Sequence, residues 1–508
     1  MGQHADDLYD LATLPQAWCD VHRIMHQDDE WGCPMCENGD PPAKEFRDIR
    51  VKPHRLRKYQ RGALAYTVRT EHPSLLMGMR LGKNAVTIRR VRSYTDCKLC
   101  LIVCPNPAFR SWKRELVREG EGLPIELVGT RKQRGKALAG YMMPTRKPRK
   151  WYIINKHGWI SIKEIASVPW DVLIIDEKII TDPTAKVTQF FLKNFRRVKH
   201  RWILSGKLAP ESETQYICPL WFTDPRNWGY AKDASWKPAY FYNIRDKYFK
   251  PWGFEWRLKK DMEAEWRAKI AKAAYIVDRK DVKLGGLIIH EQRTVQFPEH
   301  LRHAYTKLEK SFVLEINGKE IARTIYAPGK HTLFRRLCGG YVPGAEPWTA
   351  KLEELCSLLR GELKGEPAII CAMFTEEIDA IETALAAMGR VVRADGSVVG
   401  AARDKAEEAF QTGKADWFLC HPACYQYGAE LHRATTMIFF SSPESLDMRE
   451  QMENRMVDLT KQDSLLVIDM PVEDTIEEDI ITSLLLKEGR EDQTRRIVKR
   501  MQKHVATY

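Results

Sequence analysis

The segment Leu75–Ala85 reads LLMGMRLGKNA, an apolar run followed by two glycines, a lysine and a polar stretch. A strand that ends in such residues, with a helix behind it, is the arrangement of a phosphate-binding loop, in which backbone N–H groups face the anion and the lysine reaches the outer phosphates. Gly78, Gly82 and Lys83 are the candidate residues. A plain strand–turn–helix connection is the alternative, because Asn84 stands where Ser or Thr is usual.

The bulk properties of the chain favour a globular protein with a polyanionic partner. Its 508 residues predict about three domains, and 81 Lys and Arg against 68 Asp and Glu give a net charge of +13, which favours nucleic acid. No apolar run approaches the length of a membrane helix, which is about 18 residues or more. With no secretory signal in the polar N-terminus, we expect no membrane association and a cytoplasmic location, in the bacterial host cytoplasm if the chain is phage-encoded.

Residues 1–52 are predicted to form a small zinc-knuckle-like module. Cys19-x-x-His22 and Cys33-x-x-Cys36 are two ligand pairs that can together hold one tetrahedral Zn²⁺, and four ligands leave no open position for catalysis. The alternative is a set of unpaired or redox cysteines. A second histidine, at position 26, is an alternative ligand. The module could bind DNA ends, contact a protein partner or only brace the next domain.

Residues 53–235 alternate predicted strands and helices. Their continuous apolar runs indicate a parallel sheet covered on both faces, with strands near 75–77, 99–105, 151–155, 172–177 and 201–206. Ligands of such sheets bind at the carboxyl ends of the strands. Lys83, the pair Asp176-Glu177 and the pair Ser205-Gly206 fall at those ends. A carboxylate pair there suits nucleotide hydrolysis, with Asp holding Mg²⁺ and Glu orienting the attacking water.

Two further patterns in this region have two interpretations each. Cys97-x-x-Cys100 is a metal-type pair, but its position beside an apolar strand favours core thiols. The stretch 131–150 is strongly basic and contains no acid, so it is either a solvated, mobile loop or a contact to a nucleic-acid backbone. Its candidate contacts include Arg131, Lys132, Arg134 and Lys136.

The rest of the chain is predicted to be a connection and a second α/β unit. Residues 236–345 are rich in Trp and Lys, with helices expected near 258–275 and 299–312; most of these tryptophans are expected in the core rather than stacked on bases. Residues 346–508 restart the alternation, with strands near 367–372, 415–420, 436–440 and 465–469. A helical segment is expected over the last forty residues.

These segments, in this order, resemble Swi/Snf-type ATPases of helicase superfamily two, most closely the compact members of bacteriophages and bacteria. The resemblance covers residues from about 55 to 485. It rests on Tyr59-Gln60, Met79–Asn84, Leu101–Glu115, Asp176-Glu177, Leu204–Gly206, Gly428–Leu431 and Gln451-x-x-x-Arg455.

The resemblance implies two RecA-like lobes, 53–235 and 346–508, with ATP between them and DNA across both; RNA remains an alternative partner. It implies ATP and Mg²⁺ as cofactors, beside the Zn²⁺ predicted from the cysteine and histidine spacing, with catalytic roles for Lys83, Asp176, Glu177 and Arg455. It also implies cofactor contacts from Gln60, Gly78, Gly82, Lys83, Asn84, Gly428 and Gln451, with Asp176 on Mg²⁺. Trp112 and Lys113 fall in the motif that lies beside the DNA strand.

Several positions depart from the family pattern. Arg80 replaces a loop glycine, Lys178 follows the acidic pair, Lys207 replaces a threonine, and Asp458 stands where a second arginine finger is usual. Two hypotheses follow. The first is a DNA-dependent ATPase that acts as a helicase or translocase. The second is a degenerate helicase-like protein that binds DNA but does not hydrolyse ATP, and that serves as a scaffold or partner subunit. This hypothesis has two forms, one with nucleotide binding and one without.

Overall fold

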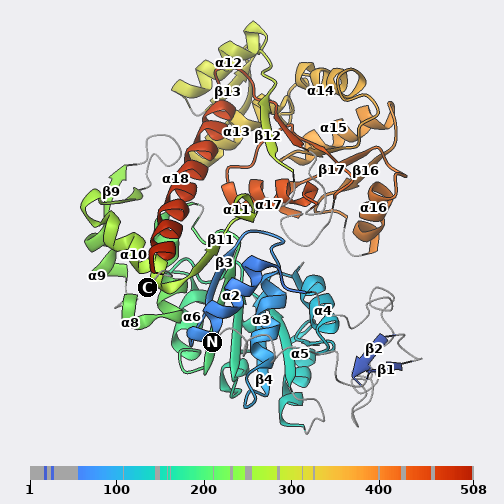
Figure 1. Cartoon of the computed structure of the whole chain (residues 1–508). Coiled ribbons are helices and arrows are strands. Elements are labelled where there is room, and N and C mark those ends of the chain that lie inside the picture. The colour runs from blue at the N-terminus through green and yellow to red at the C-terminus, as the bar shows by residue number, and fades with distance from the viewer. Residues whose placement is uncertain are drawn as a thin grey trace.

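The structure is a computed structural model that describes a β-hairpin near the N-terminus and most of the chain from residue 55 onward. The described segments are Gln16–Cys19, Ile24–Gln27, 55–106, 108–143, 149–156, 158–160, 162–209, 211–228, 233–245, 254–282, 286–311, 313–323, 327–398, 401–424, 431–458 and 464–505. The hairpin pairs β1 (Gln16–Cys19) antiparallel with β2 (Ile24–Gln27). The other described residues form two α/β lobes, one above the other in Figure 1.

The first lobe is built on a seven-stranded, fully parallel sheet with the order β11-β3-β8-β7-β4-β6-β5. The central strands are buried on both faces, which explains their continuous apolar sequences. The strands are β3 (Ser74–Met77), β4 (Leu99–Cys104), β5 (Ile125–Glu126), β6 (Lys150–Asn155), β7 (Val172–Asp176), β8 (His200–Ser205) and β11 (Tyr275–Val277).

Helices cover both faces of this sheet. One face packs against α2 (Lys58–Arg69), α3 (Lys83–Arg92) and α4 (Ala108–Arg118). The other face packs against α6 (Lys186–Asn194), α7 (Ile217–Thr223) and α10 (Glu263–Ala273). The remaining elements of this part of the chain are α5 (Arg131–Ala139), α8 (Pro225–Trp228), α9 (Asp233–Tyr240), α11 (Arg279–Val282) and the hairpin of β9 (Phe241–Arg245) and β10 (Phe254–Leu258).

The second lobe is built on a six-stranded, fully parallel sheet with the order β12-β19-β18-β15-β17-β16. Its strands are β12 (Ile288–Gln292), β15 (Ala368–Cys371), β16 (Val391–Ala394), β17 (Trp417–Cys420), β18 (Thr436–Phe439) and β19 (Leu465–Asp469). Its helices are α14 (Ala350–Arg360), α15 (Thr375–Ala386), α16 (Ala401–Gln411) and α17 (Leu446–Met456). Two apolar clusters line the two faces of the sheet.

The predicted connection, 236–345, is divided between the two lobes. Its β11 pairs in parallel with β3 at the edge of the first sheet, and its β12 pairs in parallel with β19 at the edge of the second. The part after β12 forms a small subdomain beside the second lobe with its own apolar cluster, made of α12 (Glu299–Lys310), β13 (Val313–Ile316), β14 (Lys319–Arg323) and α13 (Ala327–Gly339). The boundaries at 235 and 345 therefore cut off a strand from each sheet.

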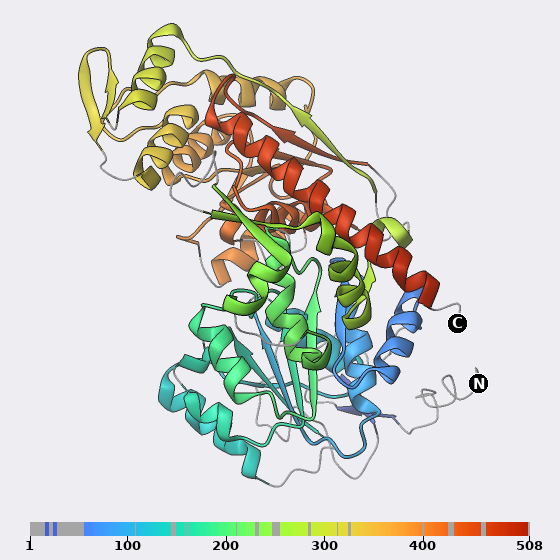
Figure 2. The same cartoon turned by 90° about the vertical axis from the view of Figure 1, so that its left-hand side faces the viewer.

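The C-terminal helix α18 (Ile476–Val505) runs along both lobes. It starts beside the second lobe and ends against α10 and β11 of the first, as Figures 1 and 2 show from two sides. Arg495 in its second half is fully buried, donates to the carbonyl of Leu76 at 3.0 Å and pairs with Asp278 at 2.5 Å. Because Leu76 is in β3, this helix is fixed at the strand that leads into the phosphate loop.

The sequence predicted most of these elements correctly. The strands 99–105, 151–155, 172–177 and 201–206 and the four strands predicted in the second unit are all present within one or two residues, and a helix covers most of the last forty residues. Within the described residues, no helix is both long and apolar enough to span a membrane.

Candidate nucleotide site between the two lobes

The phosphate-loop candidate lies at the carboxyl end of β3, where α3 begins directly at Lys83. Gly82 has φ 78°, in the left-handed region that favours glycine. A Cβ at Gly82 would stand 2.3 Å from Nε2 of Gln60, so a side chain here would displace the end of the Gln60 side chain from the loop. Gln60 donates from that atom to the carbonyl of Leu81 at 3.0 Å. The predicted adenine-binding glutamine is therefore part of the loop's own framework.

Arg80 adopts a backbone conformation that its side chain disfavours. Its φ is 62°, and among the described residues only four non-glycine residues have positive φ, of which Glu177 (φ 65°) also lies at this site. Such a conformation costs about 1–3 kcal/mol in a residue with a Cβ and persists only where the surroundings impose it. The loop thus has, at position 80, the positive φ that glycine adopts easily, although the residue there is arginine and not the glycine of the family pattern.

The acidic pair follows β7, two strands away from β3 in the sheet. Lys83 is 8% exposed, and its Nζ lies 3.7 Å from Oε1 of Glu177 and 3.4 Å from the carbonyl of Met77. Asp176 is 5% exposed, and its Oδ1 is buried with no hydrogen-bond partner. The strand order therefore brings together a lysine and two carboxylates that lie about ninety positions apart in the sequence.

Trp112 contacts Asp176, which corrects its predicted role as a nucleic-acid contact. The side chain is fully buried, and its indole Nε1 donates to Oδ2 of Asp176 at 2.8 Å. Burial, together with the charge of Glu177, raises the pKa of Asp176 to about 7, against the opposing effects of Lys83 and the Trp112 hydrogen bond. The prediction failed because the apolar face of the strongly amphipathic α4, which carries Trp112, packs on the sheet.

The second lobe contributes α17, which carries Gln451 and Arg455. Gln451 is fully buried, and neither polar atom of its side-chain amide has a hydrogen-bond partner. The side chain of Arg455 is half-buried, and its carbonyl accepts from the N–H of Leu431 at 3.0 Å. Gly428, the predicted partner in the preceding motif, lies outside the described residues. An unsatisfied buried amide is costly, at about 1–3 kcal/mol, and is typical of a group that awaits a ligand.

Five contacts join the nucleotide motifs and nearby segments of the first lobe to α17. Lys178 pairs with Asp447 at 2.8 Å, Lys207 pairs with Glu450, and Arg279 donates to Asn454 at 3.4 Å. Arg80 donates to the carbonyl of Val457, just past the end of α17, and its Nη1 lies 2.9 Å from Nδ1 of His432. Glu211 accepts from the N–H of Leu446 at 3.0 Å, at the start of α17.

The remaining predicted nucleic-acid residues lie on and near α5. The first part of the basic stretch 131–150 forms this helix instead of a loop, capped by Thr130, whose side chain accepts from the N–H of Gln133. Arg131, Lys132 and Lys136 are exposed and Arg134 is half-buried. Lys113, on α4, pairs with Glu126 at 2.7 Å and has a side chain only 18% exposed.

The predicted zinc ligands lie almost entirely outside the described residues. His22, Cys33 and Cys36 lie in segments that the structure does not describe, and Cys19 is described only as the last residue of β1. Among the residues that are described, no group of three or more His, Cys, Asp or Glu side chains is arranged to hold a metal ion. Cys97 and Cys100 are both buried in the core, as predicted.

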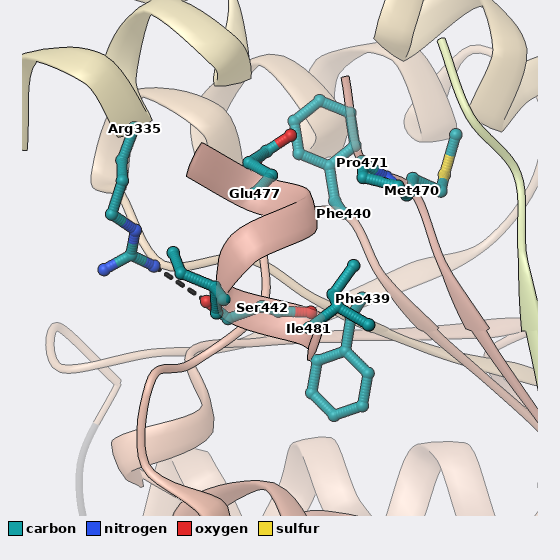
Figure 3. Close-up of a pocket in the computed structure, with 9 residues that line it drawn as sticks. Arg335, Phe439, Phe440, Ser442, Met470, Pro471, Glu477 and Ile481 are labelled. Atoms are coloured by element: carbon teal, nitrogen blue, oxygen red, sulfur yellow. Dashed lines mark hydrogen bonds between the residues drawn. The ribbon is translucent and has the colours of Figure 1, made fainter. Parts of the chain in front are cut away.

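Two cavities of the second lobe lie around α17 and α18. One, of about 10 Å³, is closed by the first turns of α18 and lined by Arg335, which donates to the carbonyl of Ser442 at 2.8 Å (Figure 3). It has room for one water molecule at most. The other, of about 140 Å³, lies between α17, β12 and α18 and is lined by charged groups that include Arg449 and Glu453.

Sequence reasoning missed the Trp112–Asp176 bond and the α17 contacts. Arg80, Lys178 and Lys207 were visible only as departures from a pattern. Their shared positive charge was the available signal, since the α17 segment that they meet carries acidic residues.

The second lobe is similar to a known family of proteins. Residues 350–458 match the family described as the helicase conserved C-terminal domain, which spans the second lobe from α14 through α17. No curated protein sequence gives a significant match. Among solved structures, the chain is similar to the Sulfolobus solfataricus SWI2/SNF2 ATPase core in complex with dsDNA, with 16% identity and a TM-score of 0.40, over 89% of this chain and 97% of that chain.

Proposed function

We propose that this chain, whose residues 350–458 match the helicase conserved C-terminal domain, is a DNA-dependent ATPase of the SNF2 type that acts as a helicase or double-strand translocase. The observation that carries the proposal is the meeting of Lys83 with Asp176 and Glu177 at the carboxyl ends of β3 and β7. The net charge of +13 supports a polyanionic partner, and the exposed basic residues of α5 offer contacts for its backbone.

The residues at this site fit a magnesium–nucleotide complex. The orphaned Oδ1 of Asp176 is a buried acceptor of the kind that a hydrated Mg²⁺ satisfies, and the amide oxygen of Asn84 is a further candidate ligand from the phosphate loop. When bound, Mg²⁺ would neutralise charge on the outer phosphates. The orphaned amide of Gln451 supplies a polar contact from the other lobe.

The residues of the chain then divide the work of hydrolysis. Gln60 is placed beside the loop to bind the adenine edge, and the Lys83 ammonium holds the outer phosphates. The Glu177 carboxylate orients the attacking water and accepts its proton as the terminal phosphate is released. Arg455, on α17, brings positive charge from the second lobe to the transferred phosphate.

ATP turnover measured with double-stranded DNA, single-stranded DNA, RNA and no nucleic acid tests the proposal. We expect DNA to stimulate wild-type turnover and Lys83→Ala to reduce it to background. Lys98→Ala removes an exposed lysine of the same lobe and should leave turnover unchanged. Background rates for wild type and Lys83→Ala alike, with and without DNA, would overturn the ATPase proposal.

The second candidate is a degenerate relative that binds DNA without hydrolysis, and one observation favours it. Arg80 occupies the phosphate loop in a strained conformation and directs its guanidinium to the second lobe. Asp458 stands where a second arginine is usual in the family, so its charge would repel a phosphate. Salt-sensitive DNA binding together with background ATP turnover would establish this candidate instead.

We also propose that the N-terminal module binds one structural Zn²⁺ through Cys19, His22, Cys33 and Cys36. The hairpin supports this, because β1 ends at Cys19 and β2 begins at Ile24, so that His22 falls between the two paired strands in the sequence. Metal analysis of Cys33→Ser/Cys36→Ser should show the loss of one zinc per chain, while Cys424→Ser should retain it. Equal zinc content in both variants would reject the site.

A further inference from the structure

Four of the five contacts between the first lobe and α17 fall on one stripe of that helix. Asp447, Glu450, Asn454 and the Val457 carbonyl are spaced at i, i+3, i+7 and i+10, which places them on one face. Each meets a different cation of the first lobe, in the order Lys178, Lys207, Arg279 and Arg80. We call these four cations and their α17 partners the clasp.

Both ends of α17 meet charges that complement the helix dipole. At the N-terminal end, the Glu211 carboxylate accepts from the N–H of Leu446 at 3.0 Å and from Oγ of Ser445 at 3.1 Å. At the C-terminal end, Arg80 donates to the carbonyl of Val457. A carboxylate at the first N–H groups and a guanidinium at the last carbonyls are each stabilising by about 0.3–1 kcal/mol or more when partly buried.

Three of the clasp cations follow or interrupt the nucleotide motifs directly. Arg80 lies in the phosphate loop, Lys178 follows Glu177, and Lys207 follows Gly206. In the family pattern, a glycine is usual at the position of Arg80, a threonine at the position of Lys207, and Ala or Ser at the position of Lys178. The three departures share one consequence, which is a cation that reaches α17.

The ion pairs of the clasp are shielded from solvent. The side chains of Lys178 and Asp447 are 11% and 19% exposed, and those of Lys207 and Glu450 are 20% and 18% exposed. Ion pairs at such depth are screened less than surface pairs and fix geometry more strongly. Lys207 also lies 3.6 Å from Asp492 of α18, so this helix joins the same junction.

We infer that Arg80, Lys178, Lys207 and Arg279 are positioning residues that set α17 in register against the phosphate loop. They hold the helix so that Gln451 and Arg455 are presented to the nucleotide site from the second lobe. Arg80, Lys178 and Lys207, which depart from the family pattern in the first-lobe motifs, thereby supply contacts between the two lobes. The role of α17 in presenting these two residues rests on the proposed function, whereas the holding of the helix does not.

A double-mutant cycle at Lys207 and Glu450, read by hydrogen exchange in the full-length chain without nucleotide, tests the inference. The variants Lys207→Gln and Glu450→Gln remove one charge each without introducing repulsion. Each should speed exchange in the α17 peptide 446–456 about ten-fold, and the double variant should be no faster than the single ones, because both lose the same contact. The conservative Lys207→Arg should retain wild-type protection.

Lys307→Gln and Glu315→Gln form the matched control pair, since they break an ion pair within the subdomain next to the second lobe. They should leave the 446–456 peptide unchanged. Unchanged exchange in α17 for Lys207→Gln, or an increase spread evenly over both lobes, would overturn the inference. An exchange rate about a hundred-fold faster in the double variant would also overturn the inference, because the effects of two independent sites multiply.

A kinetic arm separates the inference from the proposed function. Lys207→Gln should lower kcat about ten-fold with little change in KM for ATP, since the binding loop is intact and only the presentation of α17 changes. A wild-type chain without ATP turnover would refute the proposed function and leave the exchange result to decide the clasp. Normal turnover with unchanged α17 exchange would refute the clasp and leave the proposed function in place.

Discussion

The indole of Trp112 donates a 2.8 Å hydrogen bond to Oδ2 of Asp176, which links the helix after β4 to the acidic pair after β7. The bond leaves the other carboxylate oxygen, Oδ1, as the buried atom without a partner. The orientation of the Asp176 carboxylate is therefore set by a tryptophan that the sequence motif predicts to lie beside the DNA strand. In energetic terms, a hydrogen bond to a charged acceptor of this kind contributes about 1.5–3 kcal/mol.

Trp112→Phe should lower kcat for ATP about ten-fold, because it keeps the aromatic bulk and removes only the donor to Asp176. Steady-state kinetics with DNA present measures the effect. Trp202→Phe is a matched control, since Trp202 is also fully buried in the same core and its indole N–H has no partner. Equal losses in the two variants would show that Trp112 acts only through packing.

Arg495→Ala should destabilise the chain by up to about 3–5 kcal/mol, because it takes the fully buried guanidinium from the Leu76 carbonyl and from the Asp278 carboxylate, which keeps only Lys499. Urea unfolding of the full chain measures the change. Arg496→Ala removes the neighbouring arginine, which is exposed, and should shift stability by less than about 0.5 kcal/mol. A similar small effect for Arg495→Ala would mean that the end of α18 is not fixed to the first lobe.

Glu377 should make the stability of the chain fall as the pH rises from about 4.5 to about 7. Burial raises the pKa of this carboxyl from 4.5 to about 7, with a further rise from Glu477 opposed by Lys351 and Ser441. The folded state thus binds a proton more tightly than the unfolded state. This contribution to stability is fully present below the unfolded pKa and is lost as the pH rises through the folded pKa, by about 3 kcal/mol.

Glu377→Gln should therefore flatten the fall in Tm between pH 4.5 and 7.5, as measured by thermal unfolding across that range. Glu376→Gln is the control, because Glu376 is the adjacent residue but pairs with Arg336 near the surface. It should keep the wild-type pH dependence. A Glu377→Gln variant with the same slope as wild type would mean that Glu377 ionises normally in the folded chain.

Lys132→Ala/Lys136→Ala should weaken DNA binding and reduce the slope of log K against log salt by about 2, because each phosphate contact contributes about 0.9. Titrations at several salt concentrations measure the slope. Lys319→Ala/Lys364→Ala removes two exposed lysines elsewhere and should leave the slope unchanged. The same slope in both double variants would place the nucleic acid away from α5.

The sequence alone determined the elements of both lobes and the residues at their ends. A strand buried on both faces needs a continuous apolar run, and the position of Asp176 at the end of β7 follows directly from where that run stops. The edge strands β5, β11, β12 and β16 escaped detection because they are only two, three, five and four residues long and lie at sheet edges, where burial, and so the apolar pattern, is weaker.

The tertiary structure alone decided which side chains meet across those elements. Trp112 lies 64 positions from Asp176, and Lys207 lies 243 positions from Glu450. No local periodicity encodes such pairs, because they depend on strand order within a sheet and on how two separate lobes face each other. For that reason Arg80, Lys178 and Lys207 look like isolated losses in the sequence and become a connected set of lobe contacts only in the folded chain.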